Sequence, residues 1–465
     1  KTYTPCTSHP THGFRDKRHY RMLGMHPLFT LLATCPDMTT AAGAASYTRQ
    51  LITTAGLRVM LCRPGSKTPW DTRTEKEKEA DNAFLEQQRR DNPELDLPDK
   101  ISGFYLASDN PNRVAKLLRA GYKHVNTALD ERAYLLACHH LYLLKVSAET
   151  GAESTLSRDE QESASQFFYD AQATVAELTA EDAPAIRKNT ARDKQLRRAK
   201  RILSGEPLTD SEKARIDSID SAFPPDNPWP NLAVEVGGSA VVVADCDTAD
   251  ETAWFKEWAA GVSGDDSWLH TLPTVKSPGV FDAKTQTWKH RDGGHYWFSI
   301  GQEGFTDPKT GRKITPLPDS ITKLTITKPG TDVSFTLMVN KCFVLIPPSQ
   351  RAEGAYVASG PSHTMPVWLY DHIIGVEADR REQHRRRMEE RAKESGLSME
   401  DAEAVELWWN TTTWDELLSP LGWTRYGNEL DSCGCPIYSR PGGASPKSAT
   451  GHVHGCSFIT DSNDC

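Results

Sequence analysis

The chain has no long hydrophobic run anywhere in its 465 residues. A stretch of about 18 consecutive apolar residues does not occur, which excludes an ordinary membrane-spanning helix. The first residues are polar and rich in histidine and arginine, so the apolar core of a secretory signal is also missing. We therefore expect a protein that has no membrane partner and stays in the cytoplasm.

Cysteine is sparse and unevenly placed. Six of the ten cysteines lie singly between Cys6 and Cys342, which is typical of reduced cytosolic proteins and too thin for a disulfide framework. The remaining four fall close together near the C-terminus: Cys433, Cys435, Cys456 and Cys465. This cluster is a candidate metal site.

Net positive charge is missing as well. The 54 Lys and Arg residues face 63 Asp and Glu residues, for a formal net charge of −9. This argues weakly against nucleic-acid binding, because phosphate contacts need cations. The basic residues are nevertheless concentrated in two stretches, 187–201 and 380–391, so the net charge of the whole chain does not exclude nucleic-acid binding at these places. A carboxylate active site would itself add negative charge.

Composition and periodicity divide the chain into five parts and predict an α+β fold in two or three domains. We expect an N-terminal extension at 1–45, a helix–strand unit at 46–125 and an all-helical block at 126–226. A strand-rich module follows at 227–375, and a helical region rich in Cys and His ends the chain at 376–465.

Turn and cap residues indicate several element boundaries. Gly56 fits the C-cap of a helix that is followed by a strand at 57–62. A second helix is predicted to begin at Asn110-Pro111 and to stop at Gly121. Apolar residues at helical spacing fill the all-helical block, whereas several strand-like segments and one helix, at 248–261, are predicted beyond it.

The segment SAVVVADCDTAD carries the clearest chemical signal. A strand of small β-branched residues leads to Asp245 and Asp247, whose side chains should share one face because they are two residues apart. Two converging carboxylates repel each other unless a cation neutralises them, and Mg²⁺ or Mn²⁺ suits such oxygen ligands. The alternative is that Asp247 or Thr248 only caps the following helix.

Two further motifs follow in order. HRDGGHYWFSI places Gly293 and Gly294 before His295 at the start of a strand, where glycines let a backbone approach a ligand. CFVLIPPSQRAEGAY is an apolar strand that ends in Pro-Pro-Ser349 and is followed by Arg351. Taken singly, the histidine could be structural, and the Pro-Pro could simply end a strand.

In this order the motifs resemble the primase–polymerase branch of the archaeo-eukaryotic primase superfamily. That family has an Asp-x-Asp strand end, Gly-Gly-His on a strand, and a hydrophobic strand ending in Pro-Pro-Ser. Two upstream segments fit too: GLRV (56–59) with Lys67 and Pro69, and NLAV (231–234) with a Gly-Gly turn. The resemblance covers roughly 45–125 and 228–375, and it is nearest to versions carried by viruses of actinobacteria.

The resemblance implies a catalytic core with an RRM-like mixed sheet, a flanking N-terminal αβ unit and two divalent ions held by Asp245, Asp247 and Asp332. It implies DNA-templated primer synthesis and extension from NTPs or dNTPs, without a protein nucleophile. His295 would contact the phosphates of the incoming nucleotide, as Ser349 and Arg351 could, with Gly293 and Gly294 beside them.

The sequence departs from the family pattern in two ways. The all-helical block interrupts the module, so we interpret it as an insertion. Asp332 also lies further from the Pro-Pro pair than the family's third carboxylate usually does, and Asp319 is the fallback for that role.

The stretch RKNTARDKQLRRAKR is the predicted DNA-binding segment for a single-stranded template. It holds eight basic residues and one acidic residue. Its basic residues are Arg187, Lys188, Arg192, Lys194, Arg197, Arg198, Lys200 and Arg201. A solvated helix face is the alternative interpretation, and it is the preferred one for the second basic stretch, where charges of both signs alternate.

The tail offers soft ligands for a structural Zn²⁺ ion. They are Cys433, Cys435, His452, His454 and Cys456. Reduced, unligated cysteines are the alternative. The tail also resembles a module found between primase and helicase parts of phage replication proteins, although no Gly-x-x-x-x-Gly-Lys-Ser/Thr loop occurs here. A helicase partner module would therefore lie outside this chain, and an end within the cysteine-rich segment suggests truncation.

Two other function classes remain open. A metal-dependent phosphatase or nuclease could use the Asp-x-Asp pair, but a haloacid-dehalogenase-type phosphatase wants Thr or Val where Ala249 stands. A non-catalytic single-stranded-DNA-binding scaffold would use aromatic platforms and a basic groove. That interpretation leaves the buried acidic pair unexplained.

Overall fold

A computed structural model of the chain describes residues 27–34, 36–92, 97–98, 100–431, 435–442 and 447–452. The chain divides into two compact units, Lys1–Asp371 and His372–Cys465, which are described separately. Helices and mostly antiparallel sheets alternate along the first unit, so the expected α+β class is confirmed. Within the described part of the chain, every helix is too short or too polar to cross a membrane.

A three-stranded antiparallel sheet lies at the centre of the main hydrophobic core. Its order is β1–β2–β12, formed by β1 (Arg58–Cys62), β2 (Asn231–Glu235) and β12 (Phe343–Leu345). The helix α3 (Ala41–Ala55) precedes β1 and ends at Gly56, whose φ of 67° is the left-handed conformation that glycine adopts without strain. The predicted helix, cap and strand are confirmed here.

The larger sheet holds most of the motif residues. Its order is β10–β11–β3–β7–β4–β15, and β16 pairs with β7 in parallel. The strands are β3 (Val241–Thr248), β4 (Val275–Lys276), β7 (Asp292–Ser299), β10 (Lys323–Thr327), β11 (Ser334–Met338), β15 (Val357–Ala358) and β16 (His363–Thr364). The helix α9 (Ala249–Ser263) packs against β3, β7 and β11, and Phe255 lies 4.2 Å from the ring of Tyr296.

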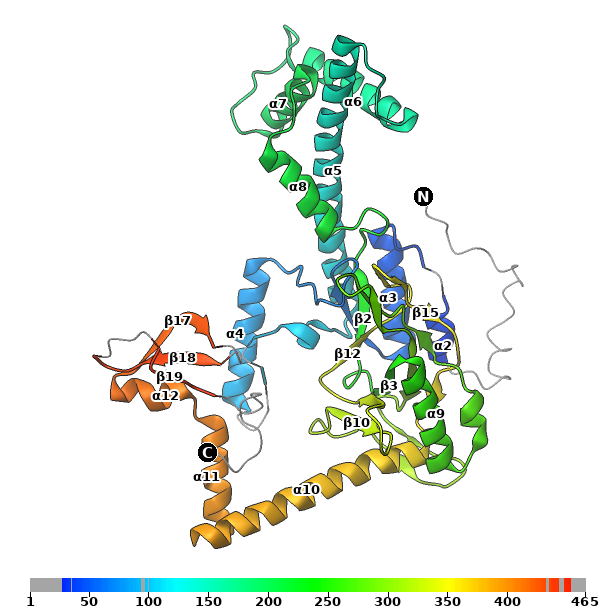
Figure 1. Cartoon of the computed structure of the whole chain (residues 1–465), viewed down its shortest axis with the longest axis vertical. Coiled ribbons are helices and arrows are strands. Elements are labelled where there is room, and N and C mark those ends of the chain that lie inside the picture. Colours follow the sequence, from blue (N-terminus) through cyan, green and yellow to red (C-terminus); the bar gives the residue numbers. More distant parts are fainter. Residues whose placement is uncertain are drawn as a thin grey trace. The chain divides into compact units, whose positions relative to one another are not determined.

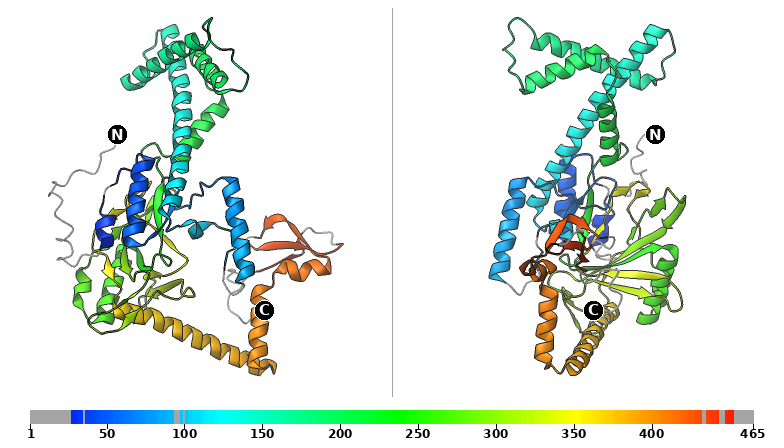
Figure 2. Two further views of the ribbon diagram at one scale, coloured as in Figure 1. Left: turned by 180° about the vertical axis from the view of Figure 1, so that it is seen from behind. Right: turned by 60° about the vertical axis from the view of Figure 1, so that its left-hand side comes forward.

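The all-helical block consists of four of the helices between β1 and β2, and the first of them begins at Pro111, before the predicted boundary at 126. They are α5 (Pro111–Thr150), α6 (Arg158–Leu178), α7 (Ala191–Ser204) and α8 (Asp210–Ala222). The helix α5 contacts α3, and it also contacts α6, α7 and α8, which gather around its far end (Figures 1 and 2). One helix therefore joins the block to the core of the first unit.

Gly121 does not end a helix, contrary to our prediction. It is an interior residue of α5, and a Cβ atom there would lie 3.3 Å from Trp70, 3.5 Å from Leu61 and 3.6 Å from Pro230. The glycine therefore allows α5 to pack closely on the core, and the helix continues to Thr150.

Short elements complete the first unit. They are α2 (Pro27–Leu32), α4 (Glu75–Asp91), η1 (Gly103–Leu106), η2 (Asp266–His270), β5 (Val280–Asp282), β6 (Thr287–His290), β8 (Phe305–Thr306), β9 (Lys313–Ile314), β13 (Gln350–Arg351) and β14 (Gly354–Ala355). Of these, the β5–β6 hairpin and the β13–β14 hairpin lie next to the motif residues in the sequence.

The helix α10 (Val367–Ser395) begins in the first unit and continues into the second. The second unit then forms α11 (Met399–Thr411), α12 (Trp414–Leu418), η3 (Ser419–Leu421) and a small antiparallel sheet. That sheet has the order β17–β18–β19, with β17 (Thr424–Leu430), β18 (Pro436–Ser439) and β19 (Ala449–Thr450).

Candidate functional site

The acidic pair lies at the end of the buried strand β3. Residues 241–244 are buried, and the side chains of Asp245 and Asp247 are 15% and 45% exposed. Thr248 caps α9, since its hydroxyl accepts a hydrogen bond from Glu251 N. Because Thr248 supplies the cap, the Asp247 carboxylate is left for another role.

His295 faces Asp245 directly across the sheet. The two residues pair between β7 and β3, and His295 Nε2 lies 3.2 Å from Asp245 Oδ1. The histidine is 3% exposed, and its Nδ1 atom has no hydrogen-bond partner among the described residues. Burial by itself raises the pKa of Asp245, but the hydrogen bond from His295 and the nearby cations outweigh it and bring the pKa below its usual range.

Two more side chains surround Asp247. His290 Nδ1 lies 3.6 Å from Asp247 Oδ2, and Glu251 Oε2 accepts a hydrogen bond from Asp247 N at 2.7 Å. Burial, together with the charges of Asp247 and Asp245, raises the pKa of Glu251. The end of β3 is therefore an acidic site with a histidine beside each aspartate.

Two cationic residues lie near the Asp245–His295 pair and its neighbour Tyr356. The ring of the buried Tyr356 is 5.9 Å from the His295 ring, and Arg351 lies close enough to Tyr356 to act on its pKa. Burial raises the pKa of Tyr356, whereas the charges of Lys67 and Arg351 lower it. Lys67 also lowers the pKa of Asp245. Lys67, Arg351 and Tyr356 thus converge on the Asp245–His295 pair from two distant segments.

Asn231 joins those two segments. Its side-chain amide donates to Ser66 O at 3.1 Å and to Gln350 O at 2.6 Å, and its Oδ1 atom accepts from Gln350 N at 2.8 Å. The loop that carries Lys67 and the strand that carries Arg351 are thereby held at one buried residue. The sequence motif pointed to this segment but not to this role.

Ser349 does not have the predicted phosphate-binding role in this structure. Its hydroxyl is buried, donates to Leu232 O and accepts from Leu232 N, both at 2.9 Å. The hydroxyl is therefore fully used in tying the end of the Pro-Pro segment to β2. Of the two residues predicted there, Arg351 alone contacts the site through its side chain.

Gly293 and Gly294 lie where β7 is closely packed by its neighbours. A Cβ atom on Gly293 would overlap the backbone of Cys246 and Asp247, and one on Gly294 would lie 2.7 Å from Pro273 Cβ and Val275 O. The glycines let β3 and β4 approach β7 closely on either side. A ligand contact at these glycines stays a prediction, and they help to place His295 opposite Asp245.

The structure does not bring Asp332 to the acidic pair. Asp332 is exposed in the turn between β10 and β11, four residues before Thr336, which pairs with Asp245. Asp332 lies before the first residue of β11, Ser334, and is therefore not the residue beside Asp245. Asp319, the fallback, is also exposed, and its charge acts on Glu235 in β2. The strand position beside Asp245 is therefore occupied by Thr336, and the prediction of a three-aspartate cluster is wrong.

The donor set at the end of β3 fits a hard divalent cation. No group of three or more metal-ligating side chains occurs among the residues that the structure describes. Mg²⁺, however, is usually held by one or two carboxylates together with substrate phosphates. Asp245 and Asp247 would be those ligands, and their oxygen atoms suit Mg²⁺ or Mn²⁺.

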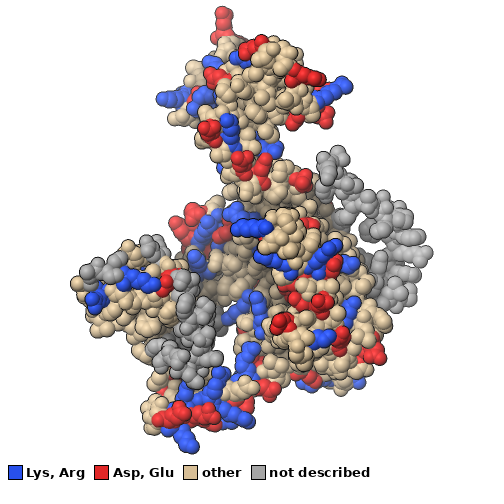
Figure 3. All heavy atoms as spheres, in the orientation of Figure 1, with Lys and Arg blue, Asp and Glu red and all other residues tan. Residues whose placement is uncertain are grey.

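The predicted DNA-binding segment lies before and within α7. Four of its residues make contacts within the helical block: Arg192 with Pro184 O, Arg197 with Asp193, Arg201 with Glu206 and Glu212, and Arg198 over the Tyr134 ring at 4.4 Å. The others, Arg187, Lys188, Lys194 and Lys200, are exposed. Figure 3 shows acidic side chains interspersed with the basic ones over the helical block.

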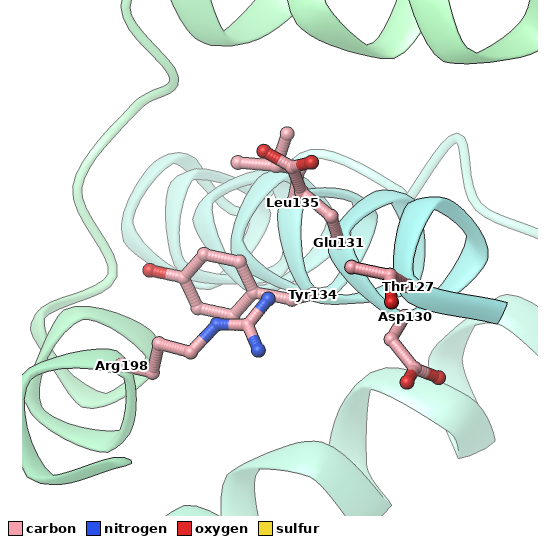
Figure 4. A pocket seen from close by; sticks show the side chains of 6 residues that line it. All are labelled: Thr127, Asp130, Glu131, Tyr134, Leu135 and Arg198. Atoms are coloured by element: carbon pink, nitrogen blue, oxygen red, sulfur yellow. The ribbon is translucent and has the colours of Figure 1, made fainter. Parts of the chain in front are cut away.

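A pocket of about 330 Å³ opens beside this segment. Arg198 from α7 and Tyr134 from α5 line it, together with Glu131, Asp130, Thr127 and Leu135 (Figure 4). Arg215 binds Glu131 at 2.7 Å, so the carboxylate there is already paired.

Two of the five candidate zinc ligands lie in the described part of the second unit. Cys435 is buried directly before β18, and His452 lies two residues after β19. If the register of the two strands continues, Cys435 stands opposite His452. Cys433, His454 and Cys456 lie outside the described residues, so zinc binding stays a prediction.

No family model, curated protein or solved structure matches this chain.

Proposed function

We propose that the chain is a template-dependent nucleotidyltransferase of the primase–polymerase type that acts in the DNA replication of a bacterial virus. The observation that carries this proposal is the Asp245–His295 pair, with Asp247 on its acidic side and with Lys67 and Arg351 on the other. Anionic and cationic groups thus lie next to each other, as a nucleoside triphosphate with its metal ion requires.

The cationic side would hold the triphosphate. Lys67 is exposed beside the pair and Arg351 is half-buried, so both can reach phosphate oxygens without prior unfolding of the site. His295 would keep Asp245 ionised and oriented through the 3.2 Å hydrogen bond, and its buried position excludes water from that contact. Asn231 would maintain the spacing between Lys67 and Arg351.

The acidic side would hold the divalent ions. When bound at Asp245 and Asp247, Mg²⁺ or Mn²⁺ would supply activation of the attacking hydroxyl and charge neutralisation at the triphosphate. Glu251, whose carboxylate binds Asp247 N, would fix the backbone of the second aspartate. Catalysis would then rest on positioning and electrostatics, and no protein nucleophile is needed.

This site fits a nucleotidyltransferase better than it fits a phosphatase with an aspartate nucleophile. The Asp245 side chain is largely buried and bonded to His295, so an in-line approach to its oxygen is restricted. The partners in this proposal are a single-stranded DNA template, NTPs or dNTPs, and a helicase module. The zinc site in the tail would be structural.

The test is metal-dependent incorporation of labelled nucleotides on single-stranded DNA templates, with Mg²⁺ and Mn²⁺ and with NTPs and dNTPs. We expect synthesis by the unaltered chain and a loss of about 10²-fold or more in Asp245→Asn with Asp247→Asn, because the ion ligands are removed. Asp332→Asn is the matched control and should stay within about twofold. Hydrolysis of p-nitrophenyl phosphate without nucleotide incorporation would instead favour a phosphatase.

A further inference from the structure

The β5–β6 hairpin presents two aromatic rings to solvent directly before the strand that carries His295. Phe281 on β5 and Trp288 on β6 are cross-strand partners, with ring centroids 5.4 Å apart in an edge-to-face arrangement. They remain 36% and 42% exposed. Large aromatic side chains are normally buried, so a paired, exposed set calls for a partner.

Basic residues flank the two rings in the sequence, and one of them lies over a ring. Segment 276–291 contains Lys276, Lys284, Lys289 and Arg291 against a single acidic residue, Asp282, in a chain whose net charge is −9. The guanidinium of Arg291 lies 5.5 Å from the centre of the Trp288 ring, and Lys289 pairs with Asp282 at 3.0 Å. Rings interleaved with cations match a polyanion that carries flat bases.

Hydrogen bonds and close packing hold the hairpin in a defined conformation. Asp282 Oδ1 accepts hydrogen bonds from Lys284 N and Thr285 N, which closes the turn. A Cβ atom on Gly279 would meet the backbone of His290, so the two strands approach closely at the base of the hairpin. The rings are therefore held in place before any partner binds, which lowers the entropy cost of binding.

Both strands of the hairpin are tied to the candidate site. His290, the last residue of β6, lies 3.6 Å from Asp247. On the other strand, Phe281 N donates to Glu353 Oε1 at 3.3 Å, and Glu353 Oε2 lies 3.5 Å from Arg351. The hairpin that carries the exposed rings therefore contacts residues of both the acidic and the cationic side of the site.

We propose that Phe281 and Trp288 form a base-stacking platform for single-stranded nucleic acid next to the nucleotidyl-transfer site. This inference rests on the proposed function, which requires a bound template. It adds the hairpin to the basic segment around α7 as a second place where single-stranded nucleic acid is recognised. The rings would stack on bases without sequence preference, while Lys284 and Arg291 would face the phosphates.

Fluorescence anisotropy with a labelled oligo-dT of about 20 nucleotides tests the platform. It is measured on the full chain with EDTA and without nucleotide, so that no synthesis occurs. We expect Trp288→Ala to weaken binding about fivefold or more, and Trp288→Phe to stay within about twofold, since a phenyl ring still stacks. Trp288→Leu should bind as weakly as Trp288→Ala, because it keeps apolar area but has no aromatic face.

Phe84→Ala is the matched control, since Phe84 is 66% exposed on α4 and should leave binding unchanged. Arg291→Gln should lower the slope of log affinity against log salt by about one. Wild-type affinity in Trp288→Ala, or in Trp288→Leu, would overturn the platform. Circular dichroism of each variant verifies that it is folded.

The two proposals fail in different ways. A chain that binds the oligonucleotide through Trp288 but incorporates no nucleotide overturns the proposed function alone. A chain that polymerises, with oligonucleotide binding insensitive to Trp288→Ala, overturns the platform alone.

Discussion

The half-buried histidine of β16 makes the stability of the first unit depend on pH. His363 pairs with Phe298 in the parallel register, its ring stacks on Phe298 at 5.7 Å, and it lies 4.9 Å from Trp268. Its Nε2 atom is buried without a hydrogen-bond partner in the described residues. Burial among aromatic rings lowers the pKa of His363 from 6.5 to about 4, because the protonated ring would lose its hydration there.

The direction of the effect follows from where the proton binds. Between about pH 6.5 and pH 4 the unfolded chain takes up a proton at His363 and the folded chain does not, so stability falls as the pH falls through this window. The pKa difference corresponds to about 3 kcal/mol in total, at about 1.4 kcal/mol for each pH unit. Roughly 2 kcal/mol of this should be lost between pH 7 and pH 4.5.

His363→Phe isolates this contribution, since phenylalanine keeps a ring between Trp268 and Phe298 and cannot take up a proton. Urea unfolding at pH 7 and pH 4.5, followed by near-ultraviolet circular dichroism of the aromatic cluster, gives the free energy of unfolding. The decrease between the two pH values should be smaller in His363→Phe than in wild type by about 2 kcal/mol. His270→Gln, at an exposed histidine, is the control. An equal decrease in wild type and His363→Phe would refute the reasoning.

Three further predictions concern the site itself. Asn231→Ala removes three hydrogen bonds, so we expect a loss of about 3 kcal/mol in the free energy of unfolding by urea and a higher KM for nucleotide. An unchanged KM would mean that Asn231 does not position Lys67 and Arg351. Gly293→Ala forces a Cβ atom into the backbone of Cys246 and Asp247, so thermal unfolding should show that the free energy of unfolding falls by about 2 kcal/mol or more. A variant as stable as wild type would contradict the close approach of β3 to β7. Chelation by EDTA should abolish nucleotide incorporation, and excess Mg²⁺ or Mn²⁺ should restore it, while synthesis that persists in EDTA would contradict a metal role for Asp245 and Asp247.

Local signals in the sequence were sufficient to predict most helices and strands and the acidic pair of the site. Gly56 as a helix cap, the helical spacing of the all-helical block and the short apolar runs of the strands are properties of neighbouring residues, and the structure has a cap, helices and strands at these places. The placement of Asp245 and Asp247 on one face also needs only the period of a strand. The resemblance of motifs implied that His295 contacts the phosphates of the nucleotide, which stays a prediction, and the register of β3 and β7 places the histidine opposite Asp245.

Tertiary structure decided what depends on register and on close packing. Thr336 stands beside Asp245, and Asp332 does not, because the hairpin of β10 and β11 pairs with β3 in one particular register, which no local pattern specifies. Gly121 lies inside α5, where the helix packs closely against Trp70 and Leu61, and that packing partner is not visible in the local sequence. The segments that carry Lys67 and Arg351 are joined by Asn231, which contacts Ser66 and Gln350 although all three residues are far apart in the sequence. By itself the sequence determined which residues could do chemistry, whereas long-range pairing determined which of them meet.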